Sequence, residues 1–364
     1  MILTFPHMGN IYLAGKILLD GLNVDYIIPP ISNKKSLEIG SKISPEEMCL
    51  PFKIMMGNYI QSIEQGADTI LLVSSCGPCR FGEYSELQVR LLRKAGYDVR
   101  FIVADLPDQL RKDSNILDIK ALFKEVVVSN RERAKSILRG IHAMNIIDDL
   151  EATAHLNSGY EEVPGESKKL LKRALRESYK EDNPKRAVAV LKEYQRKIHG
   201  IKIDTIKKCP LKIAIIGEIY TIIDGFSNLN IEEKLMDYGV STSRRLSASW
   251  WIKDSLLKLV KLNGIQTKDF SKDYLPYWVG GHARECISEA VMAHNQLYDG
   301  AIQIFPSGCM PEVVSKAILP SISRDKDFPI MTLVMDEMSS DAGYTTRIEA
   351  FLDLLERRKT PCTI

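Results

Sequence analysis

Seven cysteines are the residues of this chain best suited to chemistry. They are Cys49, Cys76, Cys79, Cys209, Cys286, Cys309 and Cys362. The number is odd, and the first residues lack the basic and apolar regions of a secretory signal, so the pattern argues against a disulfide framework. Thiolates are soft ligands that suit zinc, Cu(I) and iron–sulfur clusters. The sequence therefore favours a metal or cluster site.

Cys76 and Cys79 form a Cys-x-x-Cys motif that has four interpretations. It could perform thioredoxin-like redox chemistry, or it could be half of a zinc site, although no second pair follows at zinc-finger spacing. It could also contribute to an iron–sulfur site whose other ligands come from distant segments. The fourth interpretation is a pair of buried structural cysteines.

Five cysteines lie near the ends of predicted elements, and this common position favours a shared site over isolated structural thiols. They are Cys49, Cys76, Cys79, Cys286 and Cys309. Cys209 precedes a predicted strand and Cys362 lies in the C-terminal tail. A structural role is the simpler interpretation of each of these two when it is considered alone.

Backbone and basic groups beside the cysteines are candidates for binding a cofactor. Helices that begin after Gly77 and Met310 would offer backbone N–H groups to cluster sulfides or to an anion. Arg80 directly follows Cys79 and would place a cation beside that thiol.

Three other polar residues are weak candidates for catalysis. His282 follows two glycines and could ligate a metal or donate a hydrogen bond to a sulfide, and Glu312 lies just after the Cys309 motif. His7, near the end of the first predicted strand, is a similar candidate. A hydrogen-bonded structural histidine is nevertheless the more common case.

Composition and charge exclude several functional classes. The chain has 364 residues, with 49 Lys+Arg against 47 Asp+Glu and a net charge of +2, so nothing indicates binding to nucleic acid or to an anionic membrane. No apolar run approaches the ~20 residues of a membrane helix. Neither a phosphate-binding loop of the G-x-x-x-x-G-K-[ST] type nor a G-x-G-x-x-G motif is present. We expect a cytoplasmic protein with reduced thiols.

The elements that position these residues alternate between strand and helix in residues 1–115. The expected strands are 2–5, 24–28, 69–73 and 99–103, and the expected helices are 11–22, 45–65 and 83–95. This alternation is typical of βαβ units with a parallel sheet. Residues 116–205 carry long amphipathic patterns at 117–144 and 168–199 instead, and we expect a helical region there.

Residues 206–364 return to the α/β pattern. The expected strands are 211–216, 301–305 and 330–335, and the expected helices are 231–238, 249–262, 282–297, 312–318 and 345–357. Both α/β segments contain a strand that ends in a Cys-x-Pro motif, at Cys76 and Cys309. We therefore expect a duplicated α/β fold, with two Rossmann-like, flavodoxin-like domains (1–115 and 206–364) around a helical region (116–205). Ligands of such sheets bind at the carboxyl ends of the strands, where these cysteines fall.

Short motifs spread over nearly the whole chain resemble one family. They are Phe5-Pro6-His7-Met8-Gly9-Asn10, Cys49-Leu50-Pro51-Phe52-Lys53, Gly77-Pro78-Cys79-Arg80-Phe81-Gly82, Gly217-Glu218, Gly280-Gly281-His282, Cys309-Met310-Pro311-Glu312 and Thr332-Leu333-Val334-Met335-Asp336-Glu337. The chain is similar in these motifs to 2-hydroxyacyl-CoA dehydratase components and acyl-CoA dehydratase activase-related proteins, a group that includes the double-cubane cluster proteins.

This resemblance implies an oxygen-sensitive iron–sulfur cluster between two Rossmann-like domains. It also implies a partner, an ATP-hydrolysing iron–sulfur activase that supplies low-potential electrons. By motif, Cys49, Cys79 and Cys309 would hold a 4Fe–4S cluster and leave one iron open. An 8Fe double cubane would need six cysteines, which Cys76, Cys286 and Cys209 would complete.

The function that follows is reduction of a small substrate, or support of a radical dehydratase-type reaction, by an iron–sulfur protein acting alone or as a homodimer. No CoA-binding signature is visible, which places an acyl-CoA substrate in doubt. One alternative is a non-catalytic partner of a dehydratase system that is stabilised by zinc or by a structural 4Fe–4S cluster. Another, an ATP-driven activase, is disfavoured by the missing phosphate-binding loops.

Overall fold

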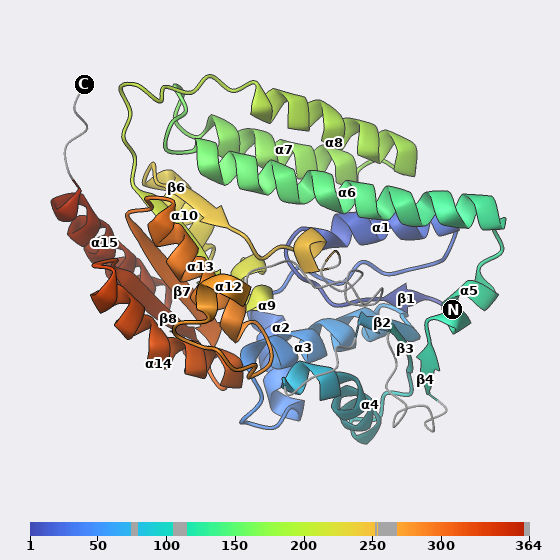
Figure 1. Cartoon of the computed structure of the whole chain (residues 1–364). Helices are drawn as coiled ribbons and strands as arrows, with labels where there is room; N and C mark the ends of the chain where they lie inside the picture. Colours follow the sequence, from blue (N-terminus) through green and yellow to red (C-terminus); the bar gives the residue numbers. More distant parts are fainter. Residues whose placement is uncertain (74–78, 105–114, 252, 254–267, 360–364) are drawn as a thin grey trace.

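Two α/β units lie beneath a layer of long helices (Figure 1). The structure is a computed structural model, and it describes residues 1–73, 79–104, 115–251, 253 and 268–359. In that part of the chain, no helix combines the length and the apolar character needed to span a bilayer.

The first unit is built on a four-stranded, fully parallel sheet. Its strands are β1 (Leu3–Thr4), β2 (Thr69–Val73), β3 (Arg100–Ala104) and β4 (Ile116–Asp118), in the order β1-β2-β3-β4. Leu3 pairs with Thr69, and Thr69 pairs in turn with Arg100. β4 starts one residue beyond the expected end of the first domain, in a segment expected to be helical, so this sheet draws its last strand from the following region.

The second unit also has a four-stranded parallel sheet. Its strands are β5 (Lys212–Gly217), β6 (Ser241–Arg244), β7 (Gly300–Pro306) and β8 (Ile330–Met335), in the order β6-β5-β7-β8. The sequence did not predict β6. Its residues Ser-Thr-Ser-Arg lack the apolar run of a buried strand, and an edge strand does not require one.

Residues 24–28 lie beside the first sheet but do not extend it by a further strand. The predicted strand 24–28 is wrong as a strand, because only Tyr26 makes a parallel bridge, to Leu3. Pro29 and Pro30 follow and have no N–H groups with which to extend the pairing. Tyr26 nevertheless lies beside β1 as β6 lies beside β5. In the second unit β5 lies between β6 and β7, so that sheet has a switch point, whereas β1 is the edge strand of the first sheet.

The helices of the first unit are α1 (Ile11–Leu22), α2 (Lys34–Ile43), α3 (Leu50–Glu64), the 3₁₀ turn η1 (Arg80–Glu83) and α4 (Tyr84–Lys94). Helices of the second unit are α9 (Ile219–Ile223), α10 (Ile231–Asp237), α12 (Lys268–Ser271), α13 (Ala283–Asn295), α14 (Met310–Asp325) and α15 (Asp341–Arg358). The helix expected at 249–262 lies mostly outside the described residues.

The helical layer consists of α5 (Lys120–Glu125), α6 (Asn130–Asn157), α7 (Glu166–Tyr179) and α8 (Pro184–His199). The pattern at 168–199 spans two helices, because Asn183 caps α8 and Pro184 occupies its first position. Proline is tolerated at this position because the N–H group that it lacks would have no hydrogen-bond partner within the helix.

A single hydrophobic core joins the two α/β units. Phe52 and Tyr59 of α3 belong to the same buried cluster as Tyr220 and Ile222 of α9. In Figure 1, α9 lies between the two units, close to α2 and α3. The carboxyl ends of both sheets therefore border one shared interior region.

Candidate metal centre

Loops that follow strands of both sheets position the candidate centre. Cys79 comes from the loop after β2, Glu218 directly follows β5, and Cys309 follows β7. Cys49 joins them from another direction, as the residue that precedes α3. Loops at a switch point are the usual place for a ligand in sheets of this order.

Cys49, Cys79 and Cys309 each occupy the N-cap position of a helix. They precede α3, η1 and α14, and none of the three side chains caps its own helix. Their backbones are extended, with ψ values of 152°, 136° and 100° respectively. Three thiols from distant segments are thus held at the starts of helices and kept out of local hydrogen bonding.

The three thiols are electrostatic neighbours of one another and of Glu218. Cys79 and Glu218 both act on Cys49, and Cys49 and Glu218 both act on Cys309. A Cβ atom built on Gly281 would lie 3.9 Å from the Cys79 sulfur and 2.6 Å from Cγ of Pro311. The Gly-Gly turn before α13 therefore closes over the centre, where only a residue without a side chain fits.

Hydrogen-bond donors point toward each thiol. The Cys49 sulfur lies 2.5 Å from the hydroxyl of Tyr84, a residue that no sequence motif singled out. Backbone N–H groups in the first turns lower the pKa of the thiols as well: that of Phe52 acts on Cys49, that of Phe81 on Cys79 and that of Glu312 on Cys309. Donors of this kind stabilise the negative charge of a thiolate.

Burial nevertheless dominates the proton affinity of the thiols. It raises the pKa of Cys49 to about 11, and it raises the pKa of Cys79 and of Cys309 as well. The Glu218 carboxylate adds to all three increases, while Arg80 lowers the pKa of Cys79. These thiols are therefore not activated as free nucleophiles. A bound metal would reverse this, because a coordinated thiol loses its proton outright.

Two carboxyl groups border the thiols, that of Glu218 half-buried and that of Glu312 buried. Glu218 caps α9, and its oxygens accept the N–H groups of Tyr220 and Thr221, yet burial raises its pKa. Glu312 is 1% exposed and accepts a 2.9 Å hydrogen bond from Gln303, and burial raises its pKa to about 7. The centre therefore carries little fixed positive charge.

The donor set fits a cluster better than a single ion. Among the described residues, no group of three or more His, Cys, Asp or Glu side chains could hold one metal ion. An iron–sulfur cubane is itself several ångströms across, so its thiolates stand farther apart than the ligands of one zinc ion. Two buried thiols and one half-buried thiol would provide the soft sulfur ligands that such a cluster uses.

The structure does not bring every predicted ligand to this centre. Cys286 is fully buried in α13, where burial and the Glu312 carboxyl group raise its pKa well above the usual range. Cys209 lies before the amino end of β5, opposite the carboxyl ends, and is disulfide-bonded. Cys76 and Gly77 lie outside the described residues.

The remaining candidates lie around the centre in different ways. Arg80 donates a 2.8 Å hydrogen bond to the Glu47 carbonyl, and Met310 begins α14 with a 40% exposed side chain. His282 precedes α13, and its ring lies 6.2 Å from that of Trp250. The sequence signal for Glu218 was weak, since Gly217-Glu218 at a strand end is common.

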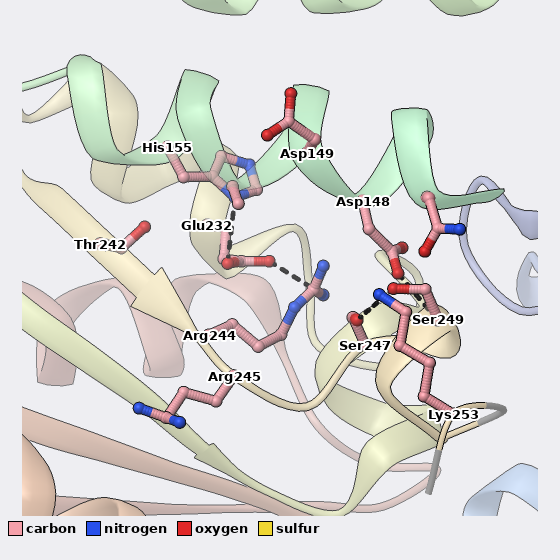
Figure 2. Close-up of a pocket in the computed structure, with 12 residues that line it drawn as sticks. Asp148, Asp149, His155, Glu232, Thr242, Arg244, Arg245, Ser247, Ser249 and Lys253 are labelled. Carbon is pink, nitrogen blue, oxygen red and sulfur yellow. Dashed lines mark hydrogen bonds and ion pairs between the residues drawn. The ribbon is translucent and has the colours of Figure 1, made fainter. Parts of the chain in front are cut away.

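A separate polar cavity of about 450 Å³ lies between α6 and the carboxyl end of β6 (Figure 2). At its base, Arg244 forms ion pairs with Glu151 at 2.7 Å and with Glu232 at 3.1 Å. Glu232 also pairs with His155 at 3.1 Å. The cations and carboxylates of this base largely neutralise one another, so the network joins the helical layer to the second unit.

No protein-family model matches this chain, and no curated protein matches it. The geometry of the centre and the resemblance of its motifs remain as the grounds for a function.

Proposed function

We propose that Cys49, Cys79 and Cys309 hold an iron–sulfur cluster between the two α/β units of an electron-accepting reductive enzyme. One observation carries the proposal: three thiols from three separate elements lie at the starts of helices, two of them buried, and all three are electrostatic neighbours of Glu218. Isolated structural cysteines have no need of such a common arrangement.

The surroundings fit a centre that works at low potential. When bound, a cluster with few cations nearby would accept single electrons at low potential. Glu218 and Glu312 border the thiols, and both carboxyl groups oppose the addition of further negative charge. The hydrophobic core that the two α/β units share restricts the access of water to the thiols.

The electrons would come from a separate ATP-dependent iron–sulfur reductase, the activase that the motif resemblance implies. A small substrate fits the enclosed centre better than an acyl-CoA, for which the sequence shows no binding signature. The other reaction that the resemblance implies, a radical dehydratase-type step, uses the same electron input. A cytoplasmic homodimer in an anaerobic cell is part of this proposal.

The decisive measurement is iron and acid-labile sulfide per chain on anaerobically purified protein, with its visible spectrum. We expect a brown protein whose iron content and colour are lost in Cys49→Ser and Cys309→Ser. Cys286→Ser is the comparison: it should leave the iron content unchanged if Cys49, Cys79 and Cys309 alone hold the cluster, and lower it if Cys286 is a further ligand of a double cubane.

The iron count also decides the type of cluster. About four irons per chain would assign one 4Fe–4S cluster to Cys49, Cys79 and Cys309. About eight would indicate the double cubane and require further thiolates. Zinc in place of iron would support the non-catalytic, metal-stabilised partner instead. A colourless protein without metal would refute both functions.

A further inference from the structure

A groove of about 560 Å³ lies where the three parts of the molecule meet. The start of α1 and residues 28–31 border it from the first unit, α7 borders it from the helical layer, and α10 borders it from the second unit. None of the residues that line it belongs to the metal centre. Junctions between structural units are a common place for small-molecule sites.

Part of the groove wall is aromatic and rigid. Tyr12 of α1 and Tyr179 of α7 meet edge to face, with ring centroids 5.8 Å apart and planes at 70°. Pro29 and Pro30 continue this wall, and their rings restrict the backbone there. The wall therefore offers a fixed apolar surface against which a planar ring can pack.

A buried histidine supports the ring of Tyr12. His7 is 4% exposed and stacks on this ring, with centroids 5.6 Å apart and planes 19° from parallel. Its Nδ1 atom donates a 3.2 Å hydrogen bond to the carboxylate of Asp224, because a carboxylate only accepts. In the structure, His7 therefore holds part of the groove wall in place.

Helix α7 makes the rest of the groove positively charged. Lys168, Lys172 and Arg176 line the groove, and the same three residues line an adjoining hollow of about 480 Å³ together with Lys169 and Arg173. Residues three or four positions apart lie side by side on a helix, so the five cations form one strip along α7. Because they share this strip, the groove and the hollow are continuous.

Carboxylates of α10 and the residue after it pair with only part of the strip. Glu233 lines the groove and forms ion pairs with Lys172 at 2.6 Å and with Lys168 at 3.5 Å. Asp237 pairs with Lys168 at 2.8 Å. The positive charge on the side of the strip away from α10 is left over.

Three cations of the strip have no carboxylate partner. Within the part of the chain that the structure describes, Lys169, Arg173 and Arg176 form no ion pair or hydrogen bond. Arg173 lies four positions from Lys169 and three from Arg176, and like charges at these spacings destabilise a helix. A bound anion would relieve this repulsion.

The two ends of the site together indicate the chemistry of a ligand. The aromatic end suits a planar ring, and three unpaired cations suit an anion with more than one charge. Arginine in particular binds phosphate oxygens through two parallel hydrogen bonds. The size of the groove lies within the range of about 300–1,000 Å³ for small-molecule sites, which favours one small ligand over a protein segment.

We propose that this groove binds a nucleoside diphosphate, with the base against Tyr12 and Tyr179 and the phosphates on the cations of α7. Arg176 is the principal anion-binding residue, because it lines both the groove and the hollow and has no other partner in the described chain. The inference goes beyond the proposed function and does not depend on the iron content of the protein.

Isothermal titration calorimetry of the full chain at low salt tests the site, with ADP and GDP as probes. We expect one nucleotide to bind per chain, with an affinity that falls as salt is added, because salt screens the charges. Adenosine lacks the phosphates and pyrophosphate lacks the base. Each should bind about tenfold more weakly than ADP, or weaker still.

Two surface variants should weaken binding without affecting the fold, since both side chains are exposed. Arg176→Gln should weaken ADP binding by about tenfold, the low end of what a hydrogen bond to a charged group contributes. Tyr179→Ala should weaken it by about fivefold, because a stacking surface is lost. Tyr179→Ala should leave pyrophosphate binding unchanged, whereas Arg176→Gln should weaken it.

Each variant has a matched control outside the groove. Arg196→Gln removes an exposed cation of α8, and so changes the net charge by the same amount. Tyr238→Ala removes a tyrosine that is 45% exposed, close to the 42% of Tyr179. Neither control should change the affinity for ADP.

The outcomes separate this inference from the proposed function. Weaker nucleotide binding in Arg176→Gln and Tyr179→Ala, with unchanged controls, supports the site. Failure of both nucleotides to bind, or equal losses in the controls, overturns it. Pyrophosphate that binds as tightly as ADP, or a glutamate-rich peptide that binds more tightly, also overturns it. A protein that binds ADP but holds no iron refutes only the proposed function.

Discussion

At the scale of single residues, the hydroxyl of Tyr84 controls the Cys49 thiol. Tyr84 is 2% exposed, and its oxygen lies 2.5 Å from the Cys49 sulfur. Burial raises the pKa of Cys49 to about 11, and the hydrogen bond from Tyr84 offsets part of that increase. The side chain therefore favours the thiolate without adding a charge.

Replacing this tyrosine should weaken the thiolate. In Tyr84→Phe, we expect the pKa of Cys49 to rise further and the midpoint potential of a bound cluster to fall, because hydrogen bonds to sulfur set that potential. Thiol alkylation against pH in metal-free protein and redox titration of loaded protein measure the two effects. Tyr238→Phe, which removes a surface bond to Glu349, is the control. An unchanged potential would refute this role of Tyr84.

The buried ion pairs at the base of the polar cavity give stability a defined dependence on pH. Burial alone would raise the pKa of Glu232, but Arg244 and His155 outweigh it and bring the pKa to about 2. Burial would lower the pKa of His155, but Glu232 outweighs it and raises that pKa. Glu232 thus stabilises the fold above its ordinary pKa of 4.5, and His155 does so below its ordinary pKa of 6.5.

We expect the contribution of this network to be largest between these two values. It should decline as the pH falls toward about 2, when Glu232 is protonated, and as the pH rises through the raised pKa of His155. Glu232→Gln should cost about 3–5 kcal/mol at pH 5.5, because it removes the buried carboxylate that pairs with both His155 and Arg244. Urea unfolding at several pH values measures this change in the free energy of unfolding. Glu193→Gln breaks an exposed pair with Lys197 and should cost almost nothing; equal losses would contradict the expectation.

At the scale of elements, the close crossing of α2 and α3 positions Cys49. A Cβ atom on Gly57 would lie 1.7 Å from the Ser36 carbonyl oxygen, and one on Gly40 would lie 1.7 Å from that of Lys53. The two helix backbones are therefore in direct contact. Since Cys49 precedes α3, this contact fixes where its thiol lies.

An added methyl group should separate the two helices. We expect Gly57→Ala to cost about 3 kcal/mol or more by overpacking, and to reduce the iron content of the anaerobic protein. Gly343→Ala is the control, because a Cβ there would lie 3.2 Å from the Ser340 hydroxyl and helix propensity favours alanine. Urea unfolding and iron analysis measure both variants. Full iron content in Gly57→Ala would show that the crossing does not position the thiol.

At the scale of the whole molecule, a charge pair joins the two α/β units near the centre. Lys53, one turn after Cys49 on α3, is buried and forms an ion pair with Glu337, which follows β8. Its ammonium group also donates a 2.8 Å hydrogen bond to the Glu46 carbonyl. Together with His7 and Asp224, this pair fixes the relative position of the units.

Removing one partner should cost more than removing both. We expect Glu337→Gln to destabilise the protein by about 2 kcal/mol, less than the ~3–5 kcal/mol of a fully buried pair because Glu337 is partly exposed. The double variant with Lys53→Met should recover most of that loss, because no buried cation is left unpaired. Urea unfolding of the three variants provides the comparison. A double variant as unstable as the sum of the single ones would argue against the charge pair.

The regular parts of the fold were predictable from local pattern. The strands at 69–73 and 330–335 and the helix at 11–22 have the apolar runs and spacing that the structure confirms. The local pattern fails to predict an element where pairing with another strand, or a proline that ends a segment, determines the structure instead. The polar edge strand β6 exists because β5 lies beside it, and residues 24–28 reduce to a bridge at Tyr26.

The sequence by itself determined an α/β protein with two parallel sheets, and it marked its cysteines as candidates at element ends. Periodicity and cysteine chemistry are local properties, so they can be read without coordinates. Only the tertiary structure decided which cysteines meet. It brings Cys49, Cys79 and Cys309 toward Glu218, keeps Cys286 inside a helix and places Cys209 at the opposite end of the sheet. It also joined His7 to Asp224 across 217 residues of chain, because packing of α9 against the first unit is a long-range property.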